Sequence, residues 1–187
     1  MQSILKSATL ALSFLIASFA ANAQVKEKTV MVGGEAMYPM KNIVENAVNS
    51  KAHTTLVAAV KAAGLVETLQ GKGPFTVFAP VNDAFENLPA GTVETLLKPE
   101  SKPTLTKVLT YHVVAGRYDF KAISAMLKKG NKTLKTVSGG TLTFMMNGPH
   151  NIVVKDENGA TANITTYDVY QSNGVIHSID AVLLPKM

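Results

Sequence analysis

Four histidines are the side chains of this chain best suited to acid–base or metal chemistry: His53, His112, His150 and His177. Histidine can act as a general base near neutral pH, and its ring nitrogens bind metal ions. No two of them have the short spacing with which one helix presents two metal ligands. His53 precedes a predicted helix and His150 lies in a predicted hairpin turn, so we predict both at the surface. The sequence therefore predicts no metal site and no cofactor.

The chain also lacks the local patterns that mark common catalytic sites. It contains no Gly-x-Ser-x-Gly, no His-Glu-x-x-His and no glycine loop of the kind that cradles phosphate. Acidic residues are few, and the sequence places no pair of them at a catalytic separation. Hydrolysis of a glycan by two carboxylates stays open as an alternative. The basic residues are scattered and not interleaved with aromatic ones, so we expect no binding of nucleic acid.

The N-terminal residues have the pattern of a secretory signal peptide. Lys6 supplies a positive start, residues 8–20 form an apolar run, and Ala21-Asn22-Ala23 is a small-x-small cleavage site. The apolar run is too short for a membrane-spanning helix. We therefore predict residues 1–23 as a signal peptide, residues 24–39 as an N-terminal arm, and one domain over residues 40–185.

Composition sets limits on the exported protein. Cleavage after Ala23 leaves 164 of the 187 residues, which suits one domain, and lowers the net charge from +5 to +4. A pI near 9.3 favours contact with anionic surfaces such as acidic polysaccharide or lipid headgroups. Cysteine is absent, so the fold has no disulfide and must be stabilised by core packing alone.

Short helices dominate the first part of the chain, and strands dominate the second. Helical spacing and capping residues predict helices over 42–49, 56–63, 65–69, 92–97, 104–109 and 121–129. Residues 134–137 and 141–145 flank Ser138-Gly139-Gly140 as a hairpin, and further strands are predicted over 152–155, 162–166 and 175–184. Hairpin connections between these strands, with no crossover helices, favour an α+β fold.

Three motifs carry a resemblance to a known family. Residues 75–79 read as a buried strand that ends at Pro80, and Asn82 then follows as a helix cap. The stretch Thr76-Val77-Phe78-Ala79-Pro80-Val81-Asn82-Asp83-Ala84-Phe85 resembles the first signature box of the fasciclin domain, with Val81 where threonine is usual. Residues 173–185 resemble the second box, and residues 109–116 resemble the Tyr-His segment between them.

The resemblance covers about residues 40–185 and implies a fold. Fasciclin domains combine a β-sandwich-like wedge of two sheets with a layer of short helices. The resemblance also implies that His112 and His177 form hydrogen bonds inside the fold, beside apolar neighbours. A ligand contact or a pH-sensing role for them stays open.

Four residues are candidates for recognition: Asp168, Val169, Tyr111 and His112. Asp168-Val169 precedes the second box, where an Asp-Ile pair in animal matrix members of the family takes part in integrin recognition. The structural interpretation, which we prefer, is that Asp168 accepts backbone N–H bonds in a turn and Val169 fills the core. Tyr111 has an apolar ring and a polar tip, which suit a core edge or an interface.

The resemblance implies an exported, non-catalytic adhesion module without cofactors, located in the periplasm or outside the cell. We expect a monomer that binds a surface protein, a matrix component or an anionic polysaccharide, with peripheral association to the cell envelope. Two alternatives belong to other classes. One is an exported enzyme that acts on glycan or cell wall, and the other is a secreted protein that binds a small ligand in an apolar pocket.

Overall fold

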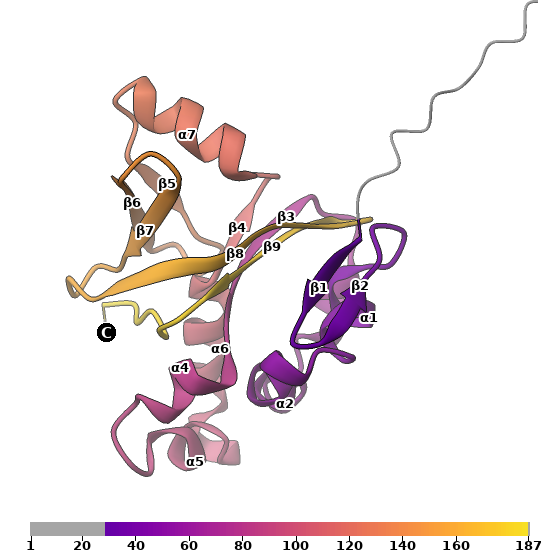
Figure 1. The fold of residues 1–187 in the computed structure, drawn as a ribbon. Coiled ribbons are helices and arrows are strands. Elements are labelled where there is room, and N and C mark those ends of the chain that lie inside the picture. Colours follow the sequence, from indigo (N-terminus) through magenta and orange to yellow (C-terminus); the bar gives the residue numbers. More distant parts are fainter. Residues whose placement is uncertain (1–28, 187) are drawn as a thin grey trace, which may run out of the picture.

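The computed structural model describes residues 29–186. Its main element is a seven-stranded sheet (Figure 1). Its strand order is β4-β3-β9-β8-β7-β6-β5. The bounds are β3 Phe75–Pro80, β4 Val113–Ala115, β5 Thr133–Lys135, β6 Thr141–Asn147, β7 Asn151–Lys155, β8 Thr161–Gln171 and β9 Gly174–Ile179. All neighbours are antiparallel except β3 and β9, which run parallel.

Strand β8 divides this sheet into two parts. Its first residues pair with β7, and from Ile164 onward it pairs with β9. The register with β9 shifts twice, between Ile164 and Thr166 and between Thr166 and Val169. Such bulges increase twist and bend a strand. The sheet therefore folds into the two-sided wedge that the sequence predicts, and the α+β fold class is confirmed.

The two signature boxes supply neighbouring strands of the sheet. The first box contains β3 and the second contains β9, and they pair in register from Phe75 with Gly174 to Pro80 with Ile179. Alternate side chains of a strand point to opposite faces. Val77 and Ala79 accordingly enter one core cluster, and Phe78 enters another. Strand β3 thus contributes side chains to both core clusters.

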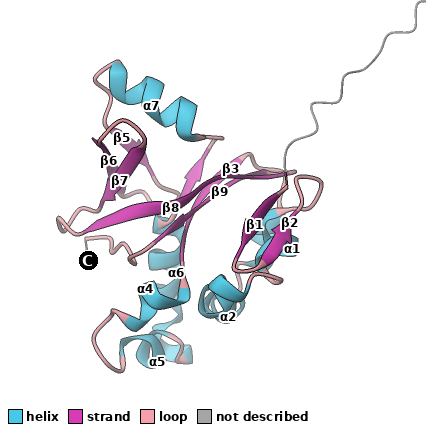
Figure 2. Cartoon of the chain, viewed as in Figure 1, coloured by secondary structure: helices cyan, strands magenta, loops and turns pink. Residues whose placement is uncertain are grey.

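Short helices cover the sheet (Figure 2). Their bounds are α1 Ile43–Ala47, α2 Thr54–Ala63, α3 Val66–Gln70, α4 Asn82–Glu86, α5 Thr92–Leu96, α6 Lys102–Tyr111 and α7 Phe120–Lys128, with 3-10 turns at Lys51–His53 and Pro99–Ser101. Helix α7 lies against β6, whereas α1 and α2 lie on the far side of β3 and β9 (Figure 1). None of the helices in residues 29–186 has the length and hydropathy needed to cross a membrane.

Asn82 has a different role from the predicted one. It is the first residue of α4 and does not precede that helix as its cap. Its Oδ1 instead accepts hydrogen bonds from Thr55 N at 3.1 Å and Thr54 Oγ1 at 3.2 Å. These donors open α2, whose own preceding residue supplies no side-chain cap. Asn82, a residue of α4, therefore accepts hydrogen bonds from donors at the start of α2 that would otherwise be unpaired.

The predicted N-terminal arm is wrong for the part of it that the structure describes. Val30–Val32 (β1) and Glu35–Met37 (β2) form an antiparallel hairpin. Its turn is Gly33-Gly34, with φ of 60° and 81°, the left-handed values that a two-residue hairpin loop requires. Val32 and Met37 are buried in the core. Burial of these side chains holds the hairpin against the domain.

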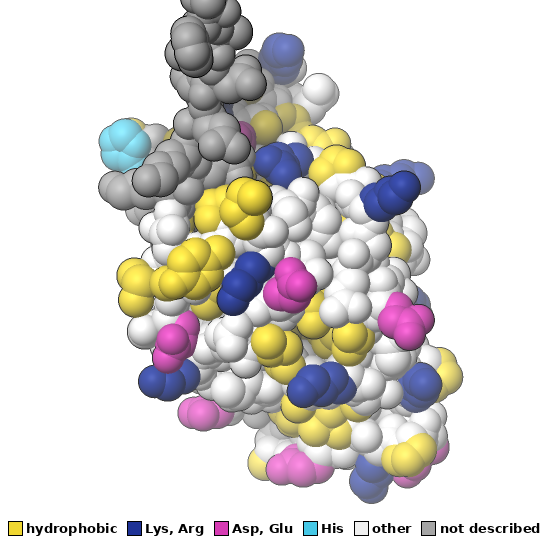
Figure 3. All heavy atoms as spheres, turned by 90° about the vertical axis from the view of Figure 1, so that its right-hand side faces the viewer, with side chains coloured by type: hydrophobic (Ala, Val, Ile, Leu, Met, Phe, Trp, Pro, Cys, Tyr) yellow, Lys and Arg dark blue, Asp and Glu magenta, His cyan; other side chains and the backbone are white. Residues whose placement is uncertain are grey.

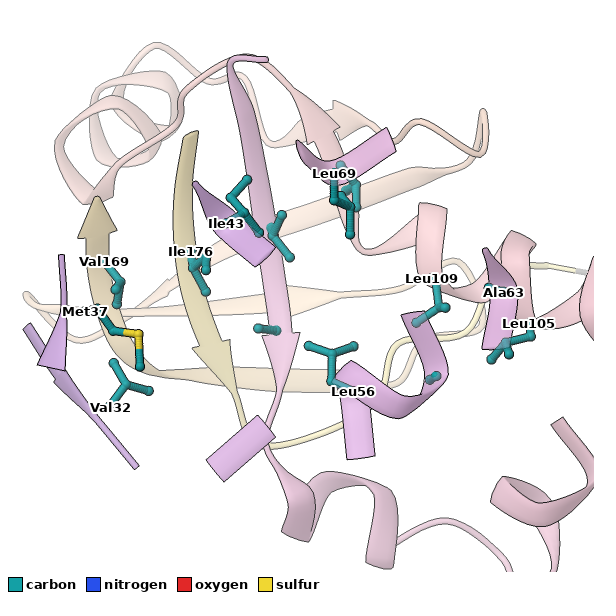
Figure 4. Packing of buried hydrophobic residues seen from close by; sticks show 14 residues of the cluster. Val32, Met37, Ile43, Leu56, Ala63, Leu69, Leu105, Leu109, Val169 and Ile176 are labelled. Atoms are coloured by element: carbon teal, nitrogen blue, oxygen red, sulfur yellow. The ribbon is translucent and has the colours of Figure 1, made fainter. Parts of the chain in front are cut away.

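Two main cores lie on opposite sides of β3. The first packs α1, α2, α3 and α6 against β3, β8 and β9, and Figure 4 shows its labelled side chains pointing into one space. The second packs α7 against the half of the sheet formed by β5 to β8. Phe78 and Phe144 meet in it, with ring centroids 5.4 Å apart.

Candidate functional site

Asp168 lies in the bulged part of β8, at the edge of the second core. Its φ of 55° makes it the one non-glycine residue with positive φ among residues 29–186. Its side chain is 31% exposed, and its Oδ1 accepts a 2.7 Å hydrogen bond from Phe120 N. Val169, by contrast, is buried in the first core. Asp168 therefore connects the bulge to the start of α7, and Val169 fills the core. Both agree with the structural interpretation.

Two substitutions at Asp168 are expected to separate its charge from its structural role. Asp168→Ala removes the acceptor for Phe120 N and places alanine at left-handed φ, so we expect a loss of about 2 kcal/mol in the free energy of unfolding. Asp168→Asn keeps an acceptor oxygen and a residue that tolerates this φ, so its loss should stay below about 1 kcal/mol. Urea unfolding at pH 7 measures both values. Equal losses would show that the hydrogen bond and the backbone conformation do not matter.

His177 faces Asp168 from β9 but takes part in no open site. Its side chain is fully buried, and its Nε2 lies 2.8 Å from Tyr118 O. Its Nδ1 accepts a 3.3 Å hydrogen bond from Asp168 N. Burial lowers the pKa of His177, while the bond to Tyr118 and the charges of Asp168 and Asp119 act in the opposite direction. The ring is neutral and bonded at both nitrogens.

Tyr111 and His112 are buried, so the prediction that they contact a partner directly is wrong. Tyr111 Oη donates to Thr141 O at 2.8 Å and accepts from Glu157 N at 3.0 Å. Burial raises the pKa of Tyr111 to about 12. The tyrosine ring is completely enclosed, and His112 is 3% exposed. The apolar pattern around both residues signals the core, not a binding surface.

The ring of His112 links helix α6 to the C-terminal segment. Its Nδ1 lies 2.8 Å from Val108 O, and its Nε2 accepts a 3.0 Å hydrogen bond from Leu183 N. Burial lowers the pKa of His112 to about 4, and the bond to Val108 and the charge of Asp156 offset part of this effect. This histidine is therefore neutral at pH 7 and positions the C-terminal segment on α6.

Of the two histidines predicted at the surface, only His150 is exposed. His53 is 3% exposed, because α2 and the sheet enclose it. Its Nδ1 and Ser50 Oγ share a 2.9 Å hydrogen bond. Its Nε2 has no hydrogen-bond partner among the described residues. Burial lowers the pKa of His53, and the backbone of Ala79 offsets part of this effect.

An apolar cavity of about 210 Å³ lies within the first core. Its walls come from α1, α2 and α3 on one side and from β3, β4, β8 and β9 on the other. Several of the core side chains labelled in Figure 4, among them Ile43, Leu56 and Ile176, line this cavity. The cavity lining includes His53 and two of the predicted recognition residues, His112 and Val169. Within residues 29–186, no cluster of three or more His, Asp or Glu side chains could hold a metal ion.

Exposed hydrophobic side chains gather in the N-terminal part of the domain. Met31, Tyr38, Met40 and Val48 are 62%, 48%, 88% and 47% exposed. Lys41 Nζ lies 5.1 Å from the centre of the Tyr38 ring. On the face that carries α2 and the β1–β2 hairpin, Figure 3 shows hydrophobic side chains interleaved with both basic and acidic ones. This face suits mixed apolar and polar contacts.

Comparison with known proteins identifies a family model and several relatives that match this chain. The family model for the Fasciclin domain matches residues 51–185. Protein sll1483 of Synechocystis sp. is 47% identical over 167 residues, which cover 89% of this chain and 86% of the relative. The cell surface glycolipoprotein MPB83 of Mycobacterium bovis is 33% identical over 159 residues, which cover 82% of this chain and 64% of the relative.

Two further matches are parts of longer chains. Transforming growth factor-beta-induced protein ig-h3 of Sus scrofa is 33% identical over 147 residues, covering 79% of this chain and 20% of ig-h3. A domain pair from the insect cell adhesion molecule fasciclin I matches in structure with a TM-score of 0.69 and 18% identity. That match covers 78% of this chain and 51% of the other, and at this identity it shows the fold alone.

Proposed function

The chain belongs to the fasciclin-domain family, and on that premise we propose that it is a secreted, non-catalytic binding module. Its partner would be a surface protein, a matrix component or an anionic polysaccharide of the periplasm or the cell exterior. The relatives support this proposal, because one of them is named a cell surface glycolipoprotein. The predicted signal peptide supports export, although it lies outside the described residues.

The observation that carries the proposal is that the buried polar side chains near the motifs form hydrogen bonds within the fold. His112 and His177 each use both ring nitrogens for bonds within the fold. Asp156 accepts bonds from Asn158 N, Ala160 N and Leu184 N. A general base needs a ring nitrogen or carboxylate within reach of a substrate. These groups already have hydrogen-bond partners inside the fold, so we propose that the protein acts by binding a partner at its surface.

Asp168 is the remaining recognition candidate, because it alone of the four predicted residues is partly exposed. Tyr170, two residues further along β8, has its ring centre 5.9 Å from the guanidinium carbon of Arg117. Tyr170 Oη donates to Asp119 Oδ2 at 3.0 Å. A partly exposed carboxylate on a bulge that is hydrogen-bonded to the start of α7 is a fixed polar contact site. We propose that a protein partner is bound here.

Attachment of the processed chain tests this proposal. Beads coated with wild type or Asp168→Asn would be applied to envelope preparations and to a layer of acidic polysaccharide. We expect Asp168→Asn to weaken protein-mediated attachment about tenfold, because a charged hydrogen bond contributes roughly 1.5–3 kcal/mol. Asp83→Asn is the matched control, since it removes the same charge from an exposed helix residue.

Four outcomes would be informative. Loss of attachment in Asp168→Asn alone supports both the function and the site. Equal attachment of all three proteins keeps the function and rejects the site. No attachment by wild type to either surface contradicts the proposed function. A fall in polysaccharide attachment at 0.5 M NaCl, by contrast, would indicate contact through the basic surface.

A further inference from the structure

The apolar cavity in the first core is large for a domain of this size. Protein interiors pack as densely as organic crystals and contain few voids larger than a water molecule. An engineered cavity of about 150 Å³ lined by apolar side chains stays dry and binds benzene. The cavity here measures about 210 Å³. Its empty volume would cost stability in proportion to its size, so an occupant that fills it would be bound favourably.

The cavity is elongated. Its lining takes Val113 from β4, Val77 from β3, Ile176 from β9 and Val169 from β8, and these four strands are consecutive neighbours. Three strand spacings of ~4.8 Å correspond to about 14 Å. Val48 and Val137, which also line the cavity, are 47% and 49% exposed. The cavity therefore reaches the surface, and a slim molecule could enter without unfolding the domain.

One buried polar group on the wall lacks a partner. Ser50 Oγ bonds His53 Nδ1, Thr110 Oγ1 donates to Thr106 O, and His112 uses both its nitrogens. Nε2 of His53 makes no hydrogen bond of good geometry within residues 29–186, although the ring lies near the backbone of Ala79 and the side chain is almost fully buried. An unpaired buried polar atom costs free energy. A ligand that offers this atom a hydrogen bond would remove that cost.

We infer that the cavity binds a small, neutral, elongated apolar molecule that carries one hydroxyl group, with the hydroxyl bonded to Nε2 of His53. A hydroxyl can donate to the bare nitrogen or accept from an N–H, so it fits either tautomer of the ring. The pKa of His53 is lowered by burial, and a neutral ring gives no charge to hold an anion. This site is independent of the attachment surface at Asp168.

The occupant is a small molecule and not a peptide, because the enclosed volume is close to that of one short hydrocarbon chain and the walls offer almost no backbone hydrogen bonds. Lys61 also lines the cavity, but it is exposed and belongs to α2 at the mouth. An anionic amphiphile could pair with this lysine. The test must therefore compare an alcohol with a carboxylate of the same chain length.

The test titrates the processed chain with 1-octanol, octanoate and toluene, and follows Tm and amide NMR shifts. We expect 1-octanol to raise Tm and to shift amides of α2 and β3, with an affinity at least tenfold above that of octanoate. Ala47→Phe places a ring on the wall and should abolish binding of 1-octanol. Ala62→Phe is the matched control, because Ala62 is exposed on α2 and does not line the cavity.

His53→Phe tests the polar contact. It keeps a ring of similar size and removes Nε2, so 1-octanol should bind about three- to tenfold more weakly, the range expected for one hydrogen bond. Toluene has no hydrogen-bonding group and should bind wild type and His53→Phe alike. The inference is overturned if 1-octanol causes no shift in wild type, if Ala47→Phe binds as wild type does, if octanoate binds as tightly as 1-octanol, or if toluene loses affinity in parallel with 1-octanol.

Discussion

Asn173→Ala is expected to lower the free energy of unfolding by about 4 kcal/mol and Tm by roughly 10 °C. Asn173 is buried in the turn between β8 and β9, and its Oδ1 accepts a 3.0 Å hydrogen bond from Ile43 N. Its Nδ2 donates to Leu69 O and Gly71 O, both at 2.8 Å. Alanine would leave these three backbone groups unpaired at a site that water does not reach.

The exposed Asn163 provides the matched control. Its Nδ2 donates to Asp180 Oδ2 at 2.8 Å, also from a position beside β9, but water can replace that bond. Asn163→Ala should therefore cost less than about 1 kcal/mol. Urea unfolding of both variants at pH 7 makes the comparison. Similar losses for the two would show that Asn173 does not connect the turn to α1 and α3 as described.

Acid is expected to destabilise the protein, with His112 alone contributing about 3 kcal/mol between pH 6.5 and pH 4. Burial lowers the pKa of His112 from 6.5 to about 4 in the folded state. The unfolded chain therefore binds a proton in this interval that the folded chain does not. Stability is fully present above pH 6.5 and falls as the pH approaches 4. The lowered pKa of His177 acts in the same direction.

Urea unfolding at pH 7 and at pH 4.5 measures this effect in wild type and in His112→Gln. The variant should be less stable at pH 7, because glutamine replaces the two ring hydrogen bonds imperfectly, but its stability should change less with pH. His150→Gln, at an exposed position, should behave as wild type does. An unchanged pH dependence in His112→Gln would contradict a neutral, buried His112.

The motifs that form β3 and β9 carry strong local signals, so these strands are predicted well, and the resemblance to the fasciclin domain implies the wedge. The strand predicted over 162–166 continues to Gln171 as β8. The hairpin of Val30–Val32 and Glu35–Met37 lies in the segment that the sequence predicts as an arm, because strands of three residues give little local pattern. Asn82 shows the limit of local reasoning. Its position predicts a cap for the next helix, yet tertiary packing directs its side chain to Thr54 and Thr55.

The candidate site is harder to predict, because burial depends on packing between distant elements. His53 looks like a surface residue before a helix, and only the helical layer over the sheet encloses it. Tyr111 and His112 belong to an apolar stretch that favours the core, but the sequence does not show which elements enclose them. The cavity has no local signal at all, because it arises from how α1, α2 and α3 sit on the sheet. Asp168 accepts a backbone N–H bond as predicted, and its side chain is also partly exposed.

Nitrogen-15 NMR of the histidine rings tests most directly the central claim that the motif histidines serve the fold. His112 should carry its proton on Nδ1, which faces Val108 O, and His177 should carry its proton on Nε2, which faces Tyr118 O. We expect these opposite neutral tautomers at pH 7, with His112 protonated only as the pH approaches 4 and His177 protonated only below the ordinary histidine pKa. Rings that exchange tautomers rapidly and titrate near pH 6.5 would contradict this claim, and would return both histidines to consideration as general bases.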